Sequence, residues 1–85
     1  MPKIDIYTKM FCPYCTHALN LLESKSVNFN EIKIDGDNAM REIMIERAKG
    51  SYTVPQIFIN DIHIGGCDDL VALERSKKLD ALLNV

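Results

Sequence analysis

The sequence predicts an α/β fold in which helices flank a mixed four-stranded sheet, with the element order βαβαββα. Segments rich in β-branched residues are separated by segments whose apolar residues recur at three- and four-residue steps. The first three elements have the order of a right-handed parallel unit. A two-residue turn later in the chain then adds an antiparallel hairpin.

The first half of the chain predicts a strand, a helix and a second strand. Residues 3–8 alternate apolar and polar side chains, which is typical of a strand. A helix is expected from Pro13, a residue that suits the first helical position, to about Lys25. The alternation is broken within residues 27–34, which predicts a strand that is buried partly on both faces or locally bulged. Residues 35–38 then turn the chain.

The second half predicts a helix followed by a hairpin. Apolar residues at helical spacing cover residues 39–49, with Asn38 as the candidate cap and Gly50 as the stop. Two short strands, 56–59 and 62–64, flank an Asn-Asp pair of the length and composition of a two-residue hairpin turn.

The last segment predicts helical structure up to the C-terminus. Leucines at helical spacing begin after Asp68 and indicate either one helix or two short ones, with the break near Lys77 and Lys78. The chain contains no internal repeat, linker or low-complexity tract. We therefore expect residues 1–85 to form a single domain.

The composition narrows the class of protein. Apolar residues make up 47% and charged residues 26%, which is normal for a soluble globular fold. The net charge is -2 and the 10 basic residues are scattered, so we expect neither nucleic acid nor an anionic membrane as a partner. No apolar run approaches the roughly 20 residues of a membrane span, and the first residues do not resemble a signal segment. We expect a cytoplasmic monomer.

Cys12-Pro13-Tyr14-Cys15 is the motif that carries chemistry. It places two thiols three residues apart on the first turn of a helix, directly after a strand and a loop. Side chains with this spacing face the same way, so the two sulfurs can form a disulfide. The unpaired N–H groups and the dipole at the helix start favour a thiolate at Cys12. We expect Cys12 to attack and the less accessible Cys15 to resolve the mixed disulfide.

Two other interpretations of these cysteines remain open. Both could be small buried hydrophobic residues, or half of a zinc site completed by Cys67 and either His17 or His63. A structural zinc site usually has a second close pair of ligands, whereas these three residues are dispersed. The sequence therefore favours a redox pair without a metal, and we expect both histidines to lie at the surface.

Four motifs resemble the glutaredoxin family, in particular the small bacterial dithiol glutaredoxins. They occur in the same order and extend over nearly all of the chain: Tyr7-Thr8-Lys9, Cys12-Pro13-Tyr14-Cys15, Thr53-Val54-Pro55 and Gly65-Gly66-Cys67-Asp68-Asp69. The resemblance implies the thioredoxin fold, which agrees with the predicted elements. It also implies glutathione as both reductant and bound ligand.

The resemblance further implies a glutathione-binding role for particular residues. Thr53 and Val54 would pair their backbone with glutathione as an extra strand, and Pro55 would be the family's cis-proline. Only about 5–6% of X–Pro bonds in folded proteins are cis, so without the resemblance an ordinary trans proline is expected. Tyr14 would flank the bound tripeptide.

The other end of glutathione would lie at the start of the last helical segment. The backbone of Cys67 and the side chains of Asp68 and Asp69 would hold its γ-glutamyl end, although either carboxylate can instead cap the helix. Gly65 and Gly66 would allow close approach of the backbone, or simply form a tight turn.

Two features of the expected site stay open. The glycine carboxylate of glutathione needs a cation, for which Lys9 is the nearest candidate and Arg47 or Lys49 are alternatives, although such side chains are often only solvated. Cys67, the third thiol, either packs as a small apolar residue or oxidises and regulates the site.

The expected function is the glutathione-dependent reduction of protein disulfides and glutathionylated proteins, with ribonucleotide reductase as a candidate protein substrate. A thioredoxin reductase could instead reduce the pair directly. A third possibility is a non-enzymatic dimer in which Cys12 and glutathione ligate a shared iron-sulfur cluster. Family members specialised for clusters generally have Gly-Phe-Ser after a single active-site cysteine, which this chain lacks.

Overall fold

The computed structural model describes residues 2–85 and contains four strands and four helices. In chain order these are β1 (Ile4–Thr8), α1 (Pro13–Ser24), β2 (Asn30–Lys33), α2 (Asn38–Arg47), β3 (Gln56–Ile59), β4 (Ile62–Gly65), α3 (Cys67–Arg75) and α4 (Leu79–Leu83). Among these residues, no helix has the length and apolar character needed to cross a membrane.

The strands form one mixed sheet with the order β2-β1-β3-β4. β1 runs parallel to β2 and antiparallel to β3, and β3 and β4 form the hairpin. Asn60 and Asp61 both have positive φ angles, 52° and 65°, which is the backbone of the turn that suits a two-residue hairpin. The mixed four-stranded sheet flanked by helices is therefore confirmed.

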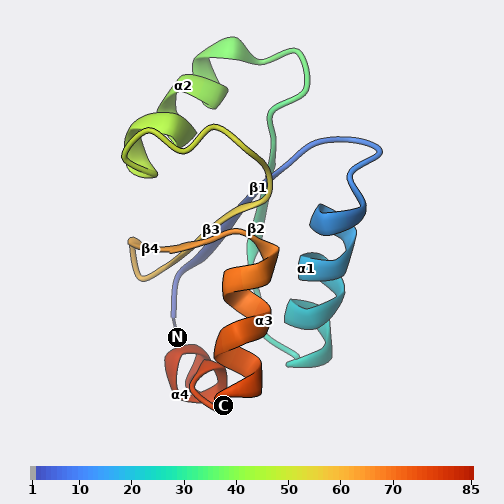
Figure 1. The fold of residues 1–85 in the computed structure, drawn as a ribbon, viewed down its shortest axis with the longest axis vertical. Coiled ribbons are helices and arrows are strands. Elements are labelled where there is room, and N and C mark those ends of the chain that lie inside the picture. Colours follow the sequence, from blue (N-terminus) through green and yellow to red (C-terminus); the bar gives the residue numbers. More distant parts are fainter. Residues whose placement is uncertain (1) are drawn as a thin grey trace.

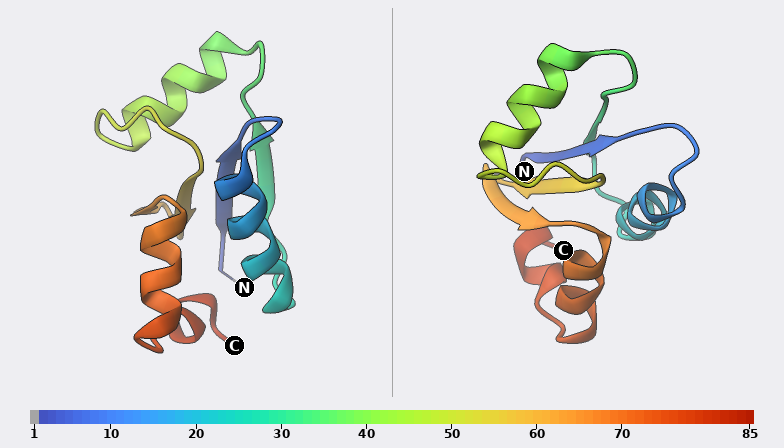
Figure 2. Two further views of the ribbon diagram at one scale, coloured as in Figure 1. Left: turned by 45° about the vertical axis from the view of Figure 1, so that its right-hand side comes forward. Right: turned by 45° about the horizontal axis from the view of Figure 1, so that its top comes forward.

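The helices cover the sheet unequally (Figures 1 and 2). Helices α1, α3 and α4 lie against one face, which we call the first face, and α2 lies alone against the second face. Side chains alternate along the central strands, so that Ile4 and Ile6 of β1 point to the first face and Tyr7 to the second. The same alternation separates Ile57 from Phe58 in β3.

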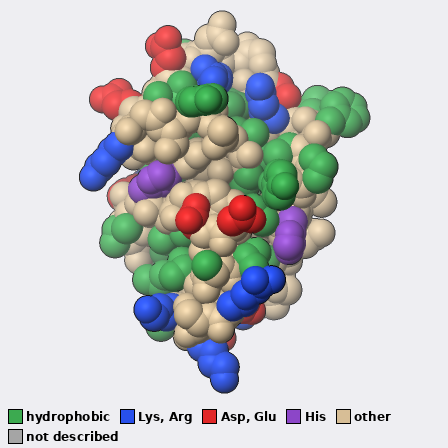
Figure 3. Space-filling model, in the orientation of Figure 1, with side chains coloured by type: hydrophobic (Ala, Val, Ile, Leu, Met, Phe, Trp, Pro, Cys, Tyr) green, Lys and Arg blue, Asp and Glu red, His purple; other side chains and the backbone are tan. Residues whose placement is uncertain are grey.

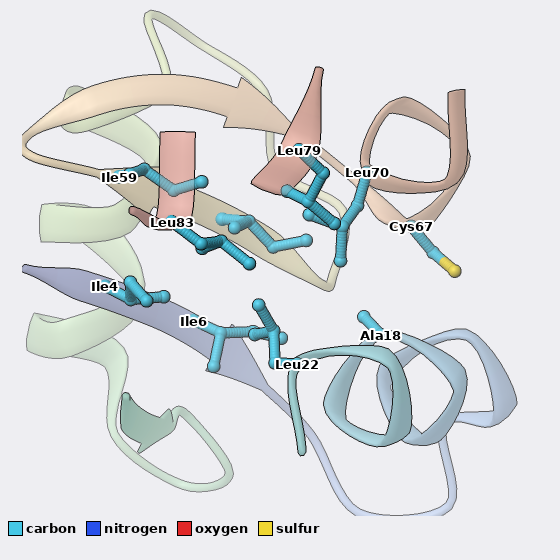
Figure 4. Close-up of a cluster of buried hydrophobic side chains, with 10 residues drawn as sticks. Ile4, Ile6, Ala18, Leu22, Ile59, Cys67, Leu70, Leu79 and Leu83 are labelled. Carbon is cyan, nitrogen blue, oxygen red and sulfur yellow. The ribbon is translucent and has the colours of Figure 1, made fainter. Parts of the chain in front are cut away.

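Each face has its own buried cluster. The first-face cluster is larger and aliphatic, and Figure 4 shows it between the sheet and helices α1, α3 and α4: Ile4, Ile6, Ala18, Leu22, Ile57, Ile59, Cys67, Leu70, Leu79 and Leu83. The second-face cluster contains both buried rings: Tyr7, Ile34, Met44, Ala48 and Phe58. The two rings meet edge to face, with their centroids 5.8 Å apart.

A cation closes the edge of the second-face cluster. The guanidinium of Arg47 lies 4.1 Å from the centroid of the Phe58 ring and donates a hydrogen bond of 2.8 Å to the Tyr7 hydroxyl. It also forms an ion pair of 3.2 Å with the buried carboxylate of Asp5. Arg47 therefore connects the C-terminal end of α2 to the centre of the sheet.

Two details of the expected secondary structure need correction, and one alternative is decided. The second strand is an exposed edge strand without a bulge, and the bulge lies instead between β3 and β4 at Ile57 and Phe58. The cap of α2 is Asp37, whose carboxylate accepts the Met40 N–H at 3.0 Å, and Asn38 is already helical. For the terminal segment the second of the two expected alternatives is confirmed: it forms two helices, and Lys77 at the break between them has a positive φ of 61°.

Candidate active site

Cys12 is the N-cap residue of α1, directly before Pro13 at the first helical position. Its backbone is extended (φ -112°, ψ 102°), which turns the side chain back over the first turn of the helix. The N–H of Cys15 donates to the Cys12 sulfur at 3.2 Å, in the position where a capping oxygen usually accepts. This N–H and the helix dipole both stabilise a negative sulfur, and the half-buried Cys12 remains open to solvent.

Cys15 lies behind Cys12 and is only 2% exposed. Burial raises the pKa of Cys15 to about 12, and hydrogen bonding and charge interaction with Cys12 act in the same direction. Cys15 is therefore a protonated thiol at neutral pH. The two sulfurs sit on one turn of one helix, with the outer one accessible and the inner one enclosed, which is the arrangement that a nucleophile and a resolving thiol require.

A groove of about 610 Å³ lies beside the thiols. It is bounded by the first turn of α1, the segment before β3, the strand β4 and the first turn of α3, and its lining residues include Tyr14, Thr53, Val54, Pro55, Gln56, His63, Gly66, Cys67, Asp68 and Asp69. The carbonyl of Val54, which lines the groove, accepts from the Cys12 thiol at 3.9 Å, so a wall of the groove contacts the accessible sulfur. All of the expected glutathione-binding residues except Lys9 line this groove.

The segment before β3 is held by a side chain that sequence reasoning missed. The Val54–Pro55 bond is cis, as the resemblance implied. Gln56 is 3% exposed and donates from Nε2 to the Thr53 carbonyl at 2.9 Å, while its Oε1 lies 2.6 Å from Nε2 of His63. His63 is half-buried and stacks on Phe58 while it lines the groove, so it is less exposed than the sequence predicted. The sequence did contain one indication of this role, because Gln56 is a single polar amide at the start of an otherwise apolar strand.

Asp68 and Asp69 differ in their surroundings although they are neighbours. The Asp69 carboxylate accepts the Gly66 N–H at 2.9 Å and so forms half of a capping box at the start of α3. Asp68 is exposed, and its carboxylate makes no hydrogen bond to the described part of the chain. Figure 3 shows acidic side chains side by side at the centre of this face, where Figure 1 has the start of α3.

Gly65 allows the close approach that this capping needs. It has a φ of +118°, and a Cβ built there would collide with the side chain of Asp69. A Cβ at Gly66 would lie 3.4 Å from the carbonyl oxygen of Pro55, which is an ordinary van der Waals contact. The close approach expected at both glycines is therefore required at Gly65 alone.

The expected cations lie outside the groove. The guanidinium of Arg47 is already bonded to Tyr7, Asp5 and Asp61, and Arg47 does not line the groove. Lys9 and Lys49 are exposed, and no lysine or arginine is among the described residues that line the groove.

The third thiol, Cys67, packs as a small apolar residue. It is buried at the border of the first-face cluster (Figure 4). Burial raises the pKa of the Cys67 thiol, and the nearby Asp68 and Cys12 add to the effect. In residues 2–85, no group of three or more His, Cys, Asp or Glu side chains is placed to hold a metal ion.

Comparisons with known proteins identify the family of this chain. The glutaredoxin family model matches residues 4–64. The chain is 58% identical over 83 residues to glutaredoxin 3 of Escherichia coli K12, covering 98% of this chain and 99% of that protein. It is 55% identical over 84 residues to a glutaredoxin of Pseudomonas aeruginosa, covering 99% of both.

A solved structure gives the same result for the fold. The crystal structure of a buckwheat glutaredoxin-glutathione complex superposes with a TM-score of 0.88 at 28% identity, covering 98% of this chain and 77% of that one. The fold is thus the thioredoxin fold as glutaredoxins have it. With Cys12 and Cys15 at the start of α1, this chain belongs to the glutaredoxin family of thiol-disulfide oxidoreductases.

Proposed function

We propose that this chain is a glutathione-disulfide oxidoreductase that reduces glutathionylated proteins and protein disulfides through Cys12 and Cys15. The observation that carries the proposal is the groove lined by the segment 53–55 and the start of α3, in which the carbonyl of Val54 contacts the accessible sulfur of Cys12. The similar buckwheat glutaredoxin was crystallised as a complex with glutathione. Glutathione is therefore the co-substrate that we assign to this groove.

A glutathionylated protein requires only Cys12. The Cys12 thiolate attacks the glutathione sulfur, so that a Cys12–glutathione disulfide forms and the protein leaves as a thiolate that takes a proton from water. A second glutathione thiolate then attacks the bound glutathione sulfur. This step releases oxidised glutathione and restores the Cys12 thiolate, which leaves Cys15 unchanged throughout.

A protein disulfide requires both thiols. Cys12 forms a mixed disulfide with one protein sulfur, and the other protein sulfur leaves as a thiol. Cys15 then gives up its proton and displaces the protein, which closes a bridge between Cys12 and Cys15. Two glutathione molecules reopen this bridge and leave as oxidised glutathione.

The two ends of glutathione would meet different groups in the groove. We assign the backbone of Thr53 and Val54 to strand-like pairing with the tripeptide, and Tyr14 to its flank. The free carboxylate of Asp68 would hold the γ-glutamyl ammonium, while the N–H groups at the start of α3 would hold the adjacent carboxylate. Asp69 would act indirectly, by fixing the Gly66 backbone.

The test is the glutathione-driven reduction of a glutathionylated peptide, coupled to glutathione reductase. We expect wild type and Cys15→Ser to be active and Cys12→Ser to be inactive. Asp68→Asn should raise the KM for glutathione about tenfold, because a lost charge-assisted contact costs roughly 1.5 kcal/mol. Inactivity of both wild type and Cys15→Ser would overturn the glutathione route and favour a direct reductase or cluster carriage.

Three further parts belong to the proposal. The single domain over residues 1–85 and the cytoplasmic monomer follow from the length and composition of the chain, and ribonucleotide reductase as a protein substrate follows from the family resemblance. A pull-down with Cys15→Ser, which traps substrates as mixed disulfides on Cys12, would identify the protein partners.

A further inference from the structure

Two large apolar side chains stand in solvent immediately before the nucleophile. Phe11 is 95% exposed and Met10 is 62% exposed, and they occupy consecutive positions in the loop between β1 and α1. Figure 3 shows hydrophobic side chains protruding at the upper right of the molecule, where Figure 1 has this loop. Single exposed apolar residues are common, but an adjacent pair at a reactive thiol indicates a contact surface.

The backbone holds this pair outward. The Met10 N–H donates to both carboxylate oxygens of Asp35, at 3.1 Å each, which fixes the loop to the end of β2. Phe11 has a positive φ of 55°, a left-handed conformation that is unfavourable for a bulky side chain. Such a conformation persists only where the surrounding structure imposes it, and it is often retained for function.

The glutathione groove does not use this surface. Tyr14 is the only residue of segment 10–14 among the described residues that line the groove. The remaining walls are the cis-proline segment, β4 and the start of α3. Glutathione bound there would leave Met10 and Phe11 uncovered.

The geometry of a mixed disulfide with Cys12 indicates which part of a substrate lies over Met10 and Phe11. In a mixed disulfide the two Cα atoms are roughly 4.4–6.8 Å apart, and consecutive Cα atoms within each chain are about 3.8 Å apart. A polypeptide bonded to Cys12 therefore has its neighbouring residues within side-chain reach of Phe11. We infer that Met10 and Phe11 form a docking surface for polypeptide substrates that carry a large apolar residue next to their reactive cysteine.

This inference deepens the proposed function and rests on thiol-disulfide exchange at Cys12. The reaction is balanced without glutathione: the Cys12 thiolate attacks one sulfur of a peptide disulfide, and one peptide leaves as a thiol. Cys15 then loses its proton, displaces the second peptide as a thiol and closes the Cys12–Cys15 bridge. The peptide disulfide is the oxidant and the reduced protein is the reductant.

The experiment compares two symmetric peptide disulfides that differ only in the residues flanking the cysteine, leucine in one and serine in the other. Reduced full-length protein is mixed with each peptide, and the second-order rate of peptide thiol release is measured. We expect wild type to prefer the leucine peptide roughly tenfold, close to the effect of burying two methylene groups. Oxidised glutathione serves as a substrate that does not cover the surface.

Phe11→Asn is the test variant, because asparagine tolerates a positive φ better than most residues. In this variant the rates with the leucine and serine peptides should differ by no more than about twofold, a difference that contact with Met10 alone can supply. The rate with oxidised glutathione should stay unchanged. Phe11→Leu should keep the preference. Ile62→Asn, which removes an apolar side chain that is 63% exposed on β4, should keep it as well.

The outcomes separate this inference from the proposed function. A wild type without peptide preference, or a Phe11→Asn variant that retains it, would overturn the docking surface. Equal slowing of the peptide and glutathione reactions in Phe11→Asn would also overturn it, because the loop would then affect only the position or reactivity of the Cys12 sulfur. A wild type that prefers the leucine peptide but does not react with oxidised glutathione would support the surface and overturn the glutathione route.

Discussion

The two faces of the sheet are built by different means. The first face is covered by α1, α3 and α4 over an aliphatic cluster, and both thiol-bearing helix starts, at Cys12 and Cys67, belong to it. The second face is covered by α2 alone over a small aromatic cluster, and Arg47 joins that helix to the sheet through a ring contact, a hydroxyl and an ion pair. Hydrophobic burial dominates on one side, and polar contacts contribute on the other.

The groove lies between elements that belong to the two different faces of the sheet. One wall is the start of α1 and α3, which the large cluster anchors. The other wall is the segment 53–55, which follows α2 and depends on the smaller cluster and on Gln56. The reactive thiols therefore sit on the more firmly packed side, and the segment assigned to glutathione sits on the less firmly packed side.

The largest expected effect tests the packing difference directly. Leu22→Ala removes a fully buried side chain from the first-face cluster, and Met44→Ala removes one from the second. Such truncations cost about 2–5 kcal/mol, less where the site can collapse. We expect Leu22→Ala near the upper end and Met44→Ala near the lower end, because the first-face cluster contains ten buried residues and the second-face cluster only five. Urea denaturation measures both, and equal losses would contradict the difference.

The second prediction concerns the polar link on the second face. Arg47→Met should lower the free energy of unfolding by about 2 kcal/mol, since it removes two ring contacts and leaves Asp5 with weaker partners. Because α2 leads into the segment 53–55, the KM for glutathione should rise while the rate of Cys12 alkylation stays unchanged. Arg41→Met, on the same helix, is the matched control, and an alkylation rate that fell with Arg47→Met would show that the two walls are coupled.

The sequence predicted the first face more fully than the second. Ala18 and Leu22 recur at helical spacing, and Ile4 and Ile6 alternate with polar residues. Each of these patterns indicates that one side of the element is buried in an apolar cluster, which is the case on the first face. Cys12 and Cys15 could be assigned because their chemistry depends on local spacing along one helix. The motif resemblance added the cis-proline, which no periodicity contains.

The polar contacts of the second face could not be predicted in the same way. Arg47 meets Asp5 across 42 residues of chain, and Gln56 meets His63 only because β3 and β4 pair with a bulge between them. An arginine on a helix is usually solvated. The contacts of Arg47 with Tyr7 and Phe58 depend on the tertiary structure alone, so the sequence did not indicate them. The distinction between Asp68 and Asp69 likewise depends on which carboxylate reaches the Gly66 N–H.

The smallest expected effect follows from the buried thiol behind Cys12. The pKa of Cys15 is raised from 9.0 to about 12 in the folded protein, chiefly by burial. Between these values the unfolded chain loses the Cys15 proton while the folded chain keeps it, so folding binds a proton and stability falls as pH rises. Relative to Cys15→Ser, reduced wild type should lose about 1 kcal/mol more of its unfolding free energy between pH 8 and pH 10. Urea denaturation of both proteins under reducing conditions measures this difference, and parallel losses would mean that Cys15 is no harder to ionise in the folded protein than in the unfolded chain.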